Sequence, residues 1–148
     1  MSNYKMIVLD LDGTLMSSKN EISPKTKEAL LKAQEQGVMI VLASGRPTYG
    51  MTKAAKELRL DQYPGYILSY NGGRIIESHS NEMIYDKSLT PEICHELYDL
   101  AREMNVNIMA YEDAAIVTAD DDQYIQKEAN INGMPINRVE NFKDSVTF

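Results

Sequence analysis

The chain has 148 residues, of which 43% are hydrophobic and 25% charged, and its formal net charge is −7. This length suffices for about one domain, or for a core domain and part of a second one. The acidic balance counts against nucleic acid and anionic membranes as partners, and no apolar stretch is long enough to span a bilayer. A single cysteine, Cys94, cannot form an internal disulfide, so we expect a cytoplasmic protein.

The first predicted element is an apolar strand over residues 6–9, which runs directly into Asp10, Asp12 and Gly13. Continuous apolar character is typical of a strand buried on both faces of a parallel sheet. The alternative is a β-hairpin, because Asp-Gly between apolar runs is a common hairpin turn. This segment alone does not distinguish a parallel strand from a β-hairpin.

The next elements favour the parallel sheet. Ser23 is a favourable N-cap and Pro24 a favourable first helical residue. The predicted elements are then a helix from Pro24 to Gly37, a strand over 38–43, a helix opening at Pro47 with the apolar stripe Met51, Ala54, Ala55 and Leu58, and a strand over 66–69. This β-α-β-α-β order predicts an α/β fold with a Rossmann-like, doubly wound parallel sheet.

Each predicted parallel strand ends in a polar turn. Asp10 and Asp12 follow the first strand, Ser44 and Arg46 the second, and Asn71 the third. Ligands of such sheets bind outside the carboxyl ends of the strands. The fold therefore predicts that these side chains converge on one crevice, which a local hairpin would not achieve.

These turns resemble a known family. The segment 10–15, Asp-Leu-Asp-Gly-Thr-Leu, is similar to the first motif of the haloacid dehalogenase superfamily, and 43–46, Ala-Ser-Gly-Arg, to its second. The segment 69–73, Ser-Tyr-Asn-Gly-Gly, is similar to the Cof-type subfamily of sugar and small-metabolite phosphatases. The resemblance implies a core like that of this superfamily, an α+β cap domain and a small phosphorylated metabolite as substrate.

The resemblance also implies roles for individual residues. Asp10 would attack phosphorus, and Asp12 would act as general acid and base, because turnover of an aspartyl-phosphate needs both functions. Mg²⁺ would be held by the Asp10 carboxylate and the Asp12 backbone carbonyl. Contacts to phosphate or substrate would come from Leu11, Gly13, Thr14, Ser44, Gly45, Arg46 and Asn71, with Arg46 and Asn71 reserved for the substrate.

The sequence covers only the first part of the family pattern. Family members carry, beyond the cap, a phosphate-binding Lys and a further acidic Mg²⁺-binding segment, and neither occurs within the 148 residues. Two strands that normally flank the first strand would also be missing. We therefore expect both domains to be incomplete, activity to be weak in isolation, and an open apolar sheet edge that pairs with another chain. The oligomeric state stays open.

The predicted domains are 1–80, the N-terminal part of the core, and 81–148, the first part of the cap, with a polar linker over 78–81 between them. In the second domain the sequence predicts a strand at 84–85. A helix should open at Pro91 and bury the stripe Ile93, Leu97, Ala101 and Met104. A hairpin of strands 106–110 and 115–118 should follow, with its turn at Glu112 and Asp113.

The acidic run Asp120, Asp121 and Asp122 is predicted to be the solvated first turn of a helix over 122–130 rather than a metal site.

Two functions remain. One is an Mg²⁺-dependent phosphatase. The other is a phospho-receiver or phosphate-binding module without turnover, which the second carboxylate at Asp12 disfavours.

Overall fold

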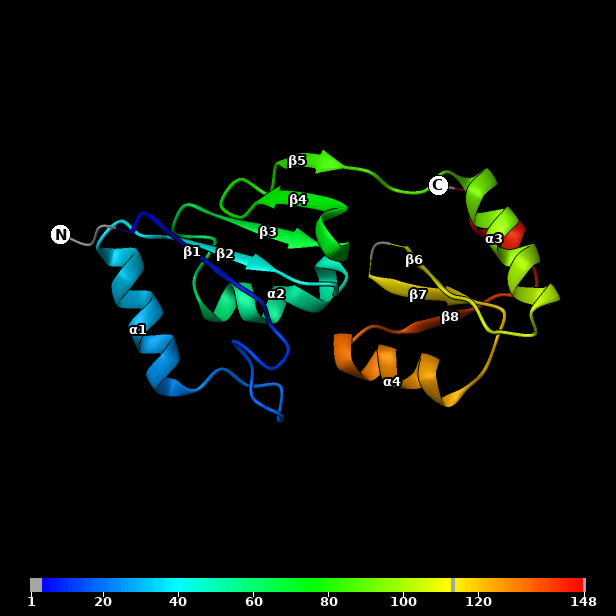
Figure 1. Cartoon of the computed structure of the whole chain (residues 1–148), viewed down its shortest axis with the longest axis horizontal. Coiled ribbons are helices and arrows are strands. Elements are labelled where there is room, and N and C mark those ends of the chain that lie inside the picture. The colour runs from blue at the N-terminus through cyan, green and yellow to red at the C-terminus, as the bar shows by residue number, and fades with distance from the viewer. Residues whose placement is uncertain (1–3, 113, 148) are drawn as a thin grey trace. The chain divides into compact units, whose positions relative to one another are not determined.

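The computed structural model of this chain describes residues 4–112 and 114–147 (Figure 1). The chain folds into two compact units, Met1–Lys87 and Ser88–Phe148. The division lies a few residues after the polar linker predicted at 78–81, because strand β5 (Met83–Asp86) pairs with β4 (Arg74–Glu77) of the first unit. Among the described residues, no helix combines the length and apolar character needed to cross a membrane.

The first unit is built on one five-stranded sheet in the order β1-β2-β3-β4-β5. Its first three strands, β1 (Met6–Leu9), β2 (Met39–Ala43) and β3 (Gly65–Ser69), are parallel, as predicted. β3, β4 and β5 then continue the sheet antiparallel. The sequence did not predict β4, whose central apolar residues are only Ile75 and Ile76. The α/β fold class is confirmed.

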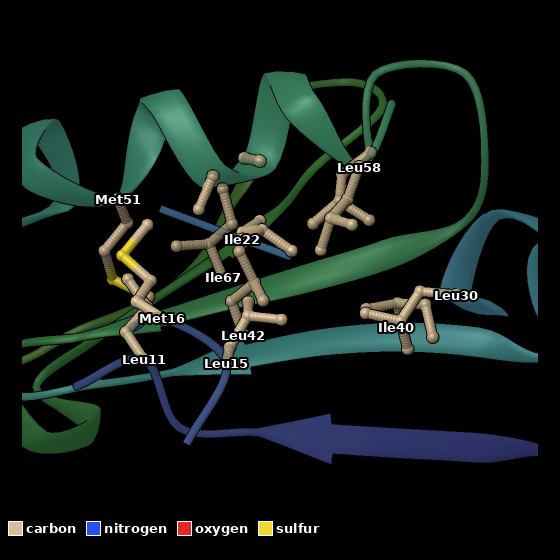
Figure 2. Close-up of a cluster of buried hydrophobic side chains, with 13 residues drawn as sticks. Leu11, Leu15, Met16, Ile22, Leu30, Ile40, Leu42, Met51, Leu58 and Ile67 are labelled. Carbon is tan, nitrogen blue, oxygen red and sulfur yellow. The ribbon is translucent and has the colours of Figure 1, made fainter. Parts of the chain in front are cut away.

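Two helices cover one face of this sheet. α1 (Pro24–Glu35) begins after Ser23, whose hydroxyl accepts the N–H of Thr26, and α2 (Thr48–Glu57) begins directly after Pro47. Figure 2 shows their apolar side chains meeting those of β2 and β3 in one cluster. The cluster comprises Leu11, Leu15, Met16, Ile22, Leu30, Ile40, Leu42, Met51, Ala54, Ala55, Leu58, Leu60 and Ile67. Among the described residues of this unit, α1 and α2 therefore pack on the same face of the sheet.

Strand β1 is the edge of the sheet, and it pairs with β2. Met6 and Val8 are 48% and 57% exposed, so the expectation of a strand buried on both faces was wrong for β1. The physical reason is position: α1 and α2 cover the face that carries Ile7 and Leu9, which pack against the cluster. The separate expectation of an open apolar edge is confirmed for the described residues.

We expect this edge to drive association, because an exposed apolar edge strand offers unpaired backbone groups to another chain. Val8→Lys should shift the chain toward monomer, since an edge lysine opposes strand addition. Sedimentation velocity over a concentration series measures the shift. Tyr124→Lys, at an exposed position on a helix of the second unit, is the matched control. Identical behaviour of both variants and the parent chain would rule out edge-driven association.

The second unit contains a three-stranded sheet in the order β6-β7-β8. β6 (Ala110–Glu112) and β7 (Ala115–Thr118) form the predicted antiparallel hairpin, and β8 (Ile136–Arg138) adds parallel to β7. The first hairpin strand is Ala110–Glu112 rather than 106–110, so Glu112, predicted in the turn, belongs to the strand. Asp113, placed at the predicted turn, lies outside the described residues. The helices are α3 (Pro91–Glu103), α4 (Gln123–Asn132) and α5 (Phe142–Ser145).

Helix α3 has the predicted extent but buries a different face. Ile93, Leu97 and Met104 are exposed, whereas Ala101 is buried as predicted. The helix instead packs Cys94 and Tyr98 against a cluster of Val117, Phe142 and Val146, and Tyr98 stacks on Phe142 at 5.0 Å between ring centroids. An aromatic ring and the short α5 determine the buried face, and neither follows from the helical spacing of aliphatic residues.

The acidic run caps α4, as predicted. The Asp122 carboxylate accepts the N–H groups of Tyr124 and Ile125. Asp120, however, is only 10% exposed, and both of its oxygens accept from the Arg102 guanidinium at 2.7 Å. Asp120 also accepts the backbone N–H of Ile108 at 3.0 Å. The expectation of a fully solvated run was therefore wrong for Asp120, because α3 brings an arginine to it.

This arrangement makes the second unit sensitive to acid. Hydrogen bonds from Arg102 hold the pKa of Asp120 below its ordinary value, so the pair stabilises the fold above the unfolded pKa of about 3.9 and is lost as pH falls through the lower folded pKa. Asp120→Asn should reduce the free energy of unfolding by about 1–3 kcal/mol at neutral pH. The same substitution should make the free energy of unfolding depend less on pH below about pH 4. Denaturant unfolding at several pH values measures both.

Asp121→Asn is the matched control, because its carboxylate is 58% exposed and pairs with Arg138 at the surface. That substitution should lower the free energy of unfolding by less than about 1 kcal/mol. Equal losses for the two variants would contradict the assignment of the acid dependence to Asp120.

Candidate active site

The candidate site begins where β1 ends. The Asp10 side chain is exposed just beyond the strand, and its backbone carbonyl accepts the N–H of Leu15 at 3.1 Å. Gly13 has φ 77°, a left-handed conformation that glycine adopts without strain, and it turns the chain back. The Leu11 side chain is fully buried in the core. Any contact of Leu11 with a phosphate would therefore have to come from its backbone.

The turn after β2 supplies the cation of the site. Ser44 follows the strand, and its hydroxyl accepts the backbone N–H of Arg46 at 3.2 Å. Arg46 is 7% exposed, and its guanidinium reaches across to the β1 turn. Nε donates to Asp12 Oδ2 at 2.8 Å and Nη2 donates to Asp12 Oδ1 at 2.6 Å. This two-pronged pair joins two turns that are far apart in the sequence.

Asp12 itself faces outward, with its side chain 59% exposed. The hydrogen bonds from Arg46 hold the pKa of this carboxyl below its ordinary value, against the opposing effect of partial burial. Asp12 is therefore an oriented carboxylate at neutral pH, with lone pairs still directed to solvent.

Asn20 also belongs to this arrangement, although the sequence analysis did not select it. Its side-chain Oδ1 accepts from Arg46 Nη2 at 2.9 Å. Asn20 lies in the loop between the β1 turn and α1, with φ 58°. An asparagine at a left-handed loop position is common in turns, so the residue type alone carried no functional signal.

The turn after β3 is bound to the turn after β2 through the backbone. The N–H of Tyr70 donates to the carbonyl of Arg46 at 3.0 Å, and the N–H of Asn71 donates to the carbonyl of Ser44 at 3.1 Å. Asn71 is exposed, and a Cβ at Gly45 would stand 3.0 Å from its Oδ1. Gly45 thus lets the Asn71 side chain lie directly over the β2 turn.

Tyr70 and Asn71 have φ values of 52° and 55°, two consecutive non-glycine residues in the left-handed region. Such a conformation is unfavourable and persists where its surroundings hold it. Here the Arg74 guanidinium lies 5.5 Å from the Tyr70 ring centroid and pairs with Asp86 at 2.5 Å. The strands β4 and β5 therefore support the turn that presents Asn71.

The three predicted turns thus form a chain of contacts, in which the turn after β2 contacts both of the others. Direct contacts join Asp12 to Arg46 and Ser44 to Asn71. Asp10, Gly13 and Thr14 are exposed on the β1 turn beside them. The Arg46 guanidinium is directed to Asp12, whereas the sequence analysis reserved it for substrate.

The chemistry of the donors suits a magnesium ion. Mg²⁺ prefers oxygen ligands and is usually held by one or two protein groups, with water and substrate phosphate completing its shell. The exposed Asp10 carboxylate and the Asp12 backbone carbonyl are donors of this kind. Within residues 4–112 and 114–147 there is no group of three or more His, Cys, Asp or Glu side chains that would form a richer cage.

The α/β sheet thus presents two carboxylates and a buried arginine at its strand ends. The chain matches the haloacid dehalogenase-like hydrolase family over residues 7–147 and belongs to that family. A haloacid dehalogenase-like hydrolase from Bacteroides thetaiotaomicron, known from a crystal structure, is 50% identical to this chain and superposes on it with a TM-score of 0.93. The match covers 99% of this chain and 55% of the Bacteroides chain.

Two Bacillus subtilis proteins are also similar. YxeH, which carries the provisional name of a phosphatase, is 31% identical over 135 residues, which are 90% of this chain and 50% of YxeH. YcsE, named as a 5-amino-6-(5-phospho-D-ribitylamino)uracil phosphatase, is 29% identical over 108 residues, which are 73% of this chain and 42% of YcsE. The chain therefore spans about half the length of the curated relatives that it matches.

Proposed function

We propose that this chain provides the nucleophile and the acid–base residue of an Mg²⁺-dependent phosphatase that hydrolyses a sugar phosphate or a similar small phosphomonoester. The observation that carries the proposal is the pair of carboxylates on the β1 turn. Asp10 is exposed at the strand end, and Asp12, two residues later, is aimed by the Arg46 guanidinium. The relative YcsE, named for a phosphorylated ribityl compound, supports the substrate class.

In the proposed reaction, an oxygen of the Asp10 carboxylate attacks phosphorus, and the bond from phosphorus to the leaving oxygen breaks. Asp12 is ionised in the free chain, and the negative charge of a phosphate bound beside it favours its protonated form. The Asp12 proton then passes to that leaving oxygen, so an alcohol departs. Asp12, now ionised, takes a proton from water, and the resulting hydroxide attacks phosphorus. The bond between the Asp10 oxygen and phosphorus breaks, so inorganic phosphate leaves, the Asp10 carboxylate is restored and Asp12 again carries a proton.

The other residues of the three turns bind and orient. The Ser44 hydroxyl and the amide groups at the start of α2 would donate hydrogen bonds to phosphate oxygens. Asn71, exposed over Gly45, would contact the substrate. When bound at Asp10 and the Asp12 carbonyl, Mg²⁺ would neutralise phosphate charge.

The first test is hydrolysis of an aryl phosphate with and without Mg²⁺. It should be run on two proteins, this chain and a chimera. The chimera joins this chain to the part of the Bacteroides thetaiotaomicron hydrolase that has no counterpart in this chain. Metal-dependent turnover by the chimera, with weak or no turnover by the chain, would support the proposal. Phosphorylation of Asp10 without turnover in either protein would favour a phospho-receiver instead.

A further inference from the structure

The loop that precedes α1 contacts the Arg46 guanidinium through the Asn20 side chain. Asn20 Oδ1 and Asp12 Oδ1 both accept from the same nitrogen, Arg46 Nη2, at 2.9 and 2.6 Å. This nitrogen carries two hydrogens, so Asn20 receives one and Asp12 the other. The guanidinium therefore lies between a loop amide on one side and the reactive carboxylate on the other.

Burial makes these contacts consequential. Arg46 is 7% exposed, and a cation removed from water is unfavourable unless its N–H groups are satisfied. The contact of Nη2 with Asn20 Oδ1, at 2.9 Å, has the length of a full hydrogen bond. Asn20 thus opposes rotation of the guanidinium plane away from Asp12.

The loop holds Asn20 firmly in place. Its backbone N–H donates to the Ser17 carbonyl at 2.9 Å, and the Ser17 N–H donates to the Glu21 carbonyl at 2.9 Å. Met16 and Ile22, which flank the loop, form an antiparallel bridge and are both buried. The amide of Asn20 is therefore presented by a closed, anchored turn.

We propose that Asn20 is a positioning residue, which holds the Arg46 guanidinium in the plane that aims the Asp12 carboxylate at the leaving oxygen. This inference rests on the proposed phosphatase function. Asn20 acts through Arg46, and its contribution is to the orientation of Asp12 rather than to substrate binding. A small loss of orientation at a catalytic group is sufficient to slow a reaction substantially.

Asn20→Gly is the sharpest variant, because glycine accepts φ 58° without strain and removes the whole side chain with its amide. Asn20→Asp retains an oxygen at the same place. Asn81→Gly is the matched control, since Asn81 has φ 58° as well, in the exposed turn between β4 and β5.

The first readout is the Arg46 Nε–H signal in nitrogen-15 NMR spectra of this chain. We expect slow hydrogen exchange of Nε–H in the parent chain, in Asn81→Gly and in Asn20→Asp, and exchange about tenfold or more faster in Asn20→Gly. Unchanged exchange in Asn20→Gly would overturn the inference, because the guanidinium would then be held without Asn20.

The second readout is the kinetics of aryl phosphate hydrolysis in whichever of the chain and the chimera turns over. Asn20→Gly should lower kcat about tenfold with KM changed less than about twofold, and Asn20→Asp should restore most of kcat. Asp10→Asn serves as the reference. If Asp10→Asn is inactive while Asn20→Gly has the parent kcat, the inference fails; if Asp10→Asn keeps full activity, the proposed function fails instead.

Discussion

Replacing Asp10 with asparagine is expected to reduce aryl phosphate hydrolysis by about 10³-fold or more, because an amide oxygen is a far weaker nucleophile toward phosphorus than a carboxylate. The substitution is nearly isosteric and lies at an exposed strand end, so the fold should persist. Substrate binding should largely survive, since the donors of the β2 turn and Asn71 are unchanged. Steady-state kinetics and binding of inorganic phosphate measure the two effects separately.

The matched control for that variant is Asp61→Asn, an exposed aspartate in the loop after α2. It should retain the parent rate. An undiminished rate in Asp10→Asn would remove Asp10 as nucleophile and, with it, the proposed aspartyl-phosphate. A parallel loss in both variants would point to a general defect of the protein.

Replacing Asp12 with asparagine is expected to trap the phosphorylated enzyme. An aryl oxide leaves without a proton, so attack by Asp10 should still occur, whereas hydrolysis of the aspartyl-phosphate lacks its base. Turnover should fall by about 10²–10⁴-fold, and intact mass should increase by one phosphoryl group on Asp10. A burst of aryl oxide followed by a slow steady state is the kinetic signature.

The Asp12→Asn variant also separates the two candidate functions. A phosphatase loses turnover and accumulates phosphoenzyme, whereas a receiver without turnover keeps the same phosphoenzyme lifetime in parent and variant. Since the substitution removes the negative charge that pairs with Arg46, the free energy of unfolding must be measured alongside. The Arg46→Lys variant is a useful comparison, because a lysine keeps the charge but not the two-pronged geometry.

The open edge at β1 and the greater length of the relatives both bear on whether strands beside β1 are needed for activity. The Bacteroides thetaiotaomicron structure continues beyond the matched part, which is 55% of its chain. In this chain, β1 carries exposed Met6 and Val8 beside the turn that holds Asp10. Neighbouring strands at that edge would cover apolar surface and rigidify the turn that holds Asp10, which is why the chimera is the decisive comparison for activity.

Local sequence signals were sufficient for much of the first unit. Ser23 and Pro24 predicted the start of α1, and the stripe from Met51 to Leu58 predicted the buried face of α2. The signals worked because capping, proline geometry and apolar spacing act within a few residues. β4 was missed, since only two of its four residues are strongly apolar and the preceding glycines suggest a loop.

In the second unit the same signals predicted the extent of α3 and the start of α4, which ends at Asn132 rather than at 130, but not the buried face of α3. That face depends on Tyr98 stacking with Phe142, a contact between residues far apart in the sequence. Likewise, Asp120 has the local pattern of a solvated helix start, and only the approach of Arg102 makes it a buried partner.

The sequence by itself determined the α/β class, the family motifs and the placing of Asp10, Asp12, Ser44, Arg46 and Asn71 at strand ends, because parallel strands bring their carboxyl ends to one edge. The tertiary structure alone decided what these side chains touch. It turned Arg46 toward Asp12 rather than outward, and it brought in Asn20 from a loop with no motif. Hydrogen-bond partners of a buried cation depend on which segments fold over it, and short-range sequence patterns do not encode that.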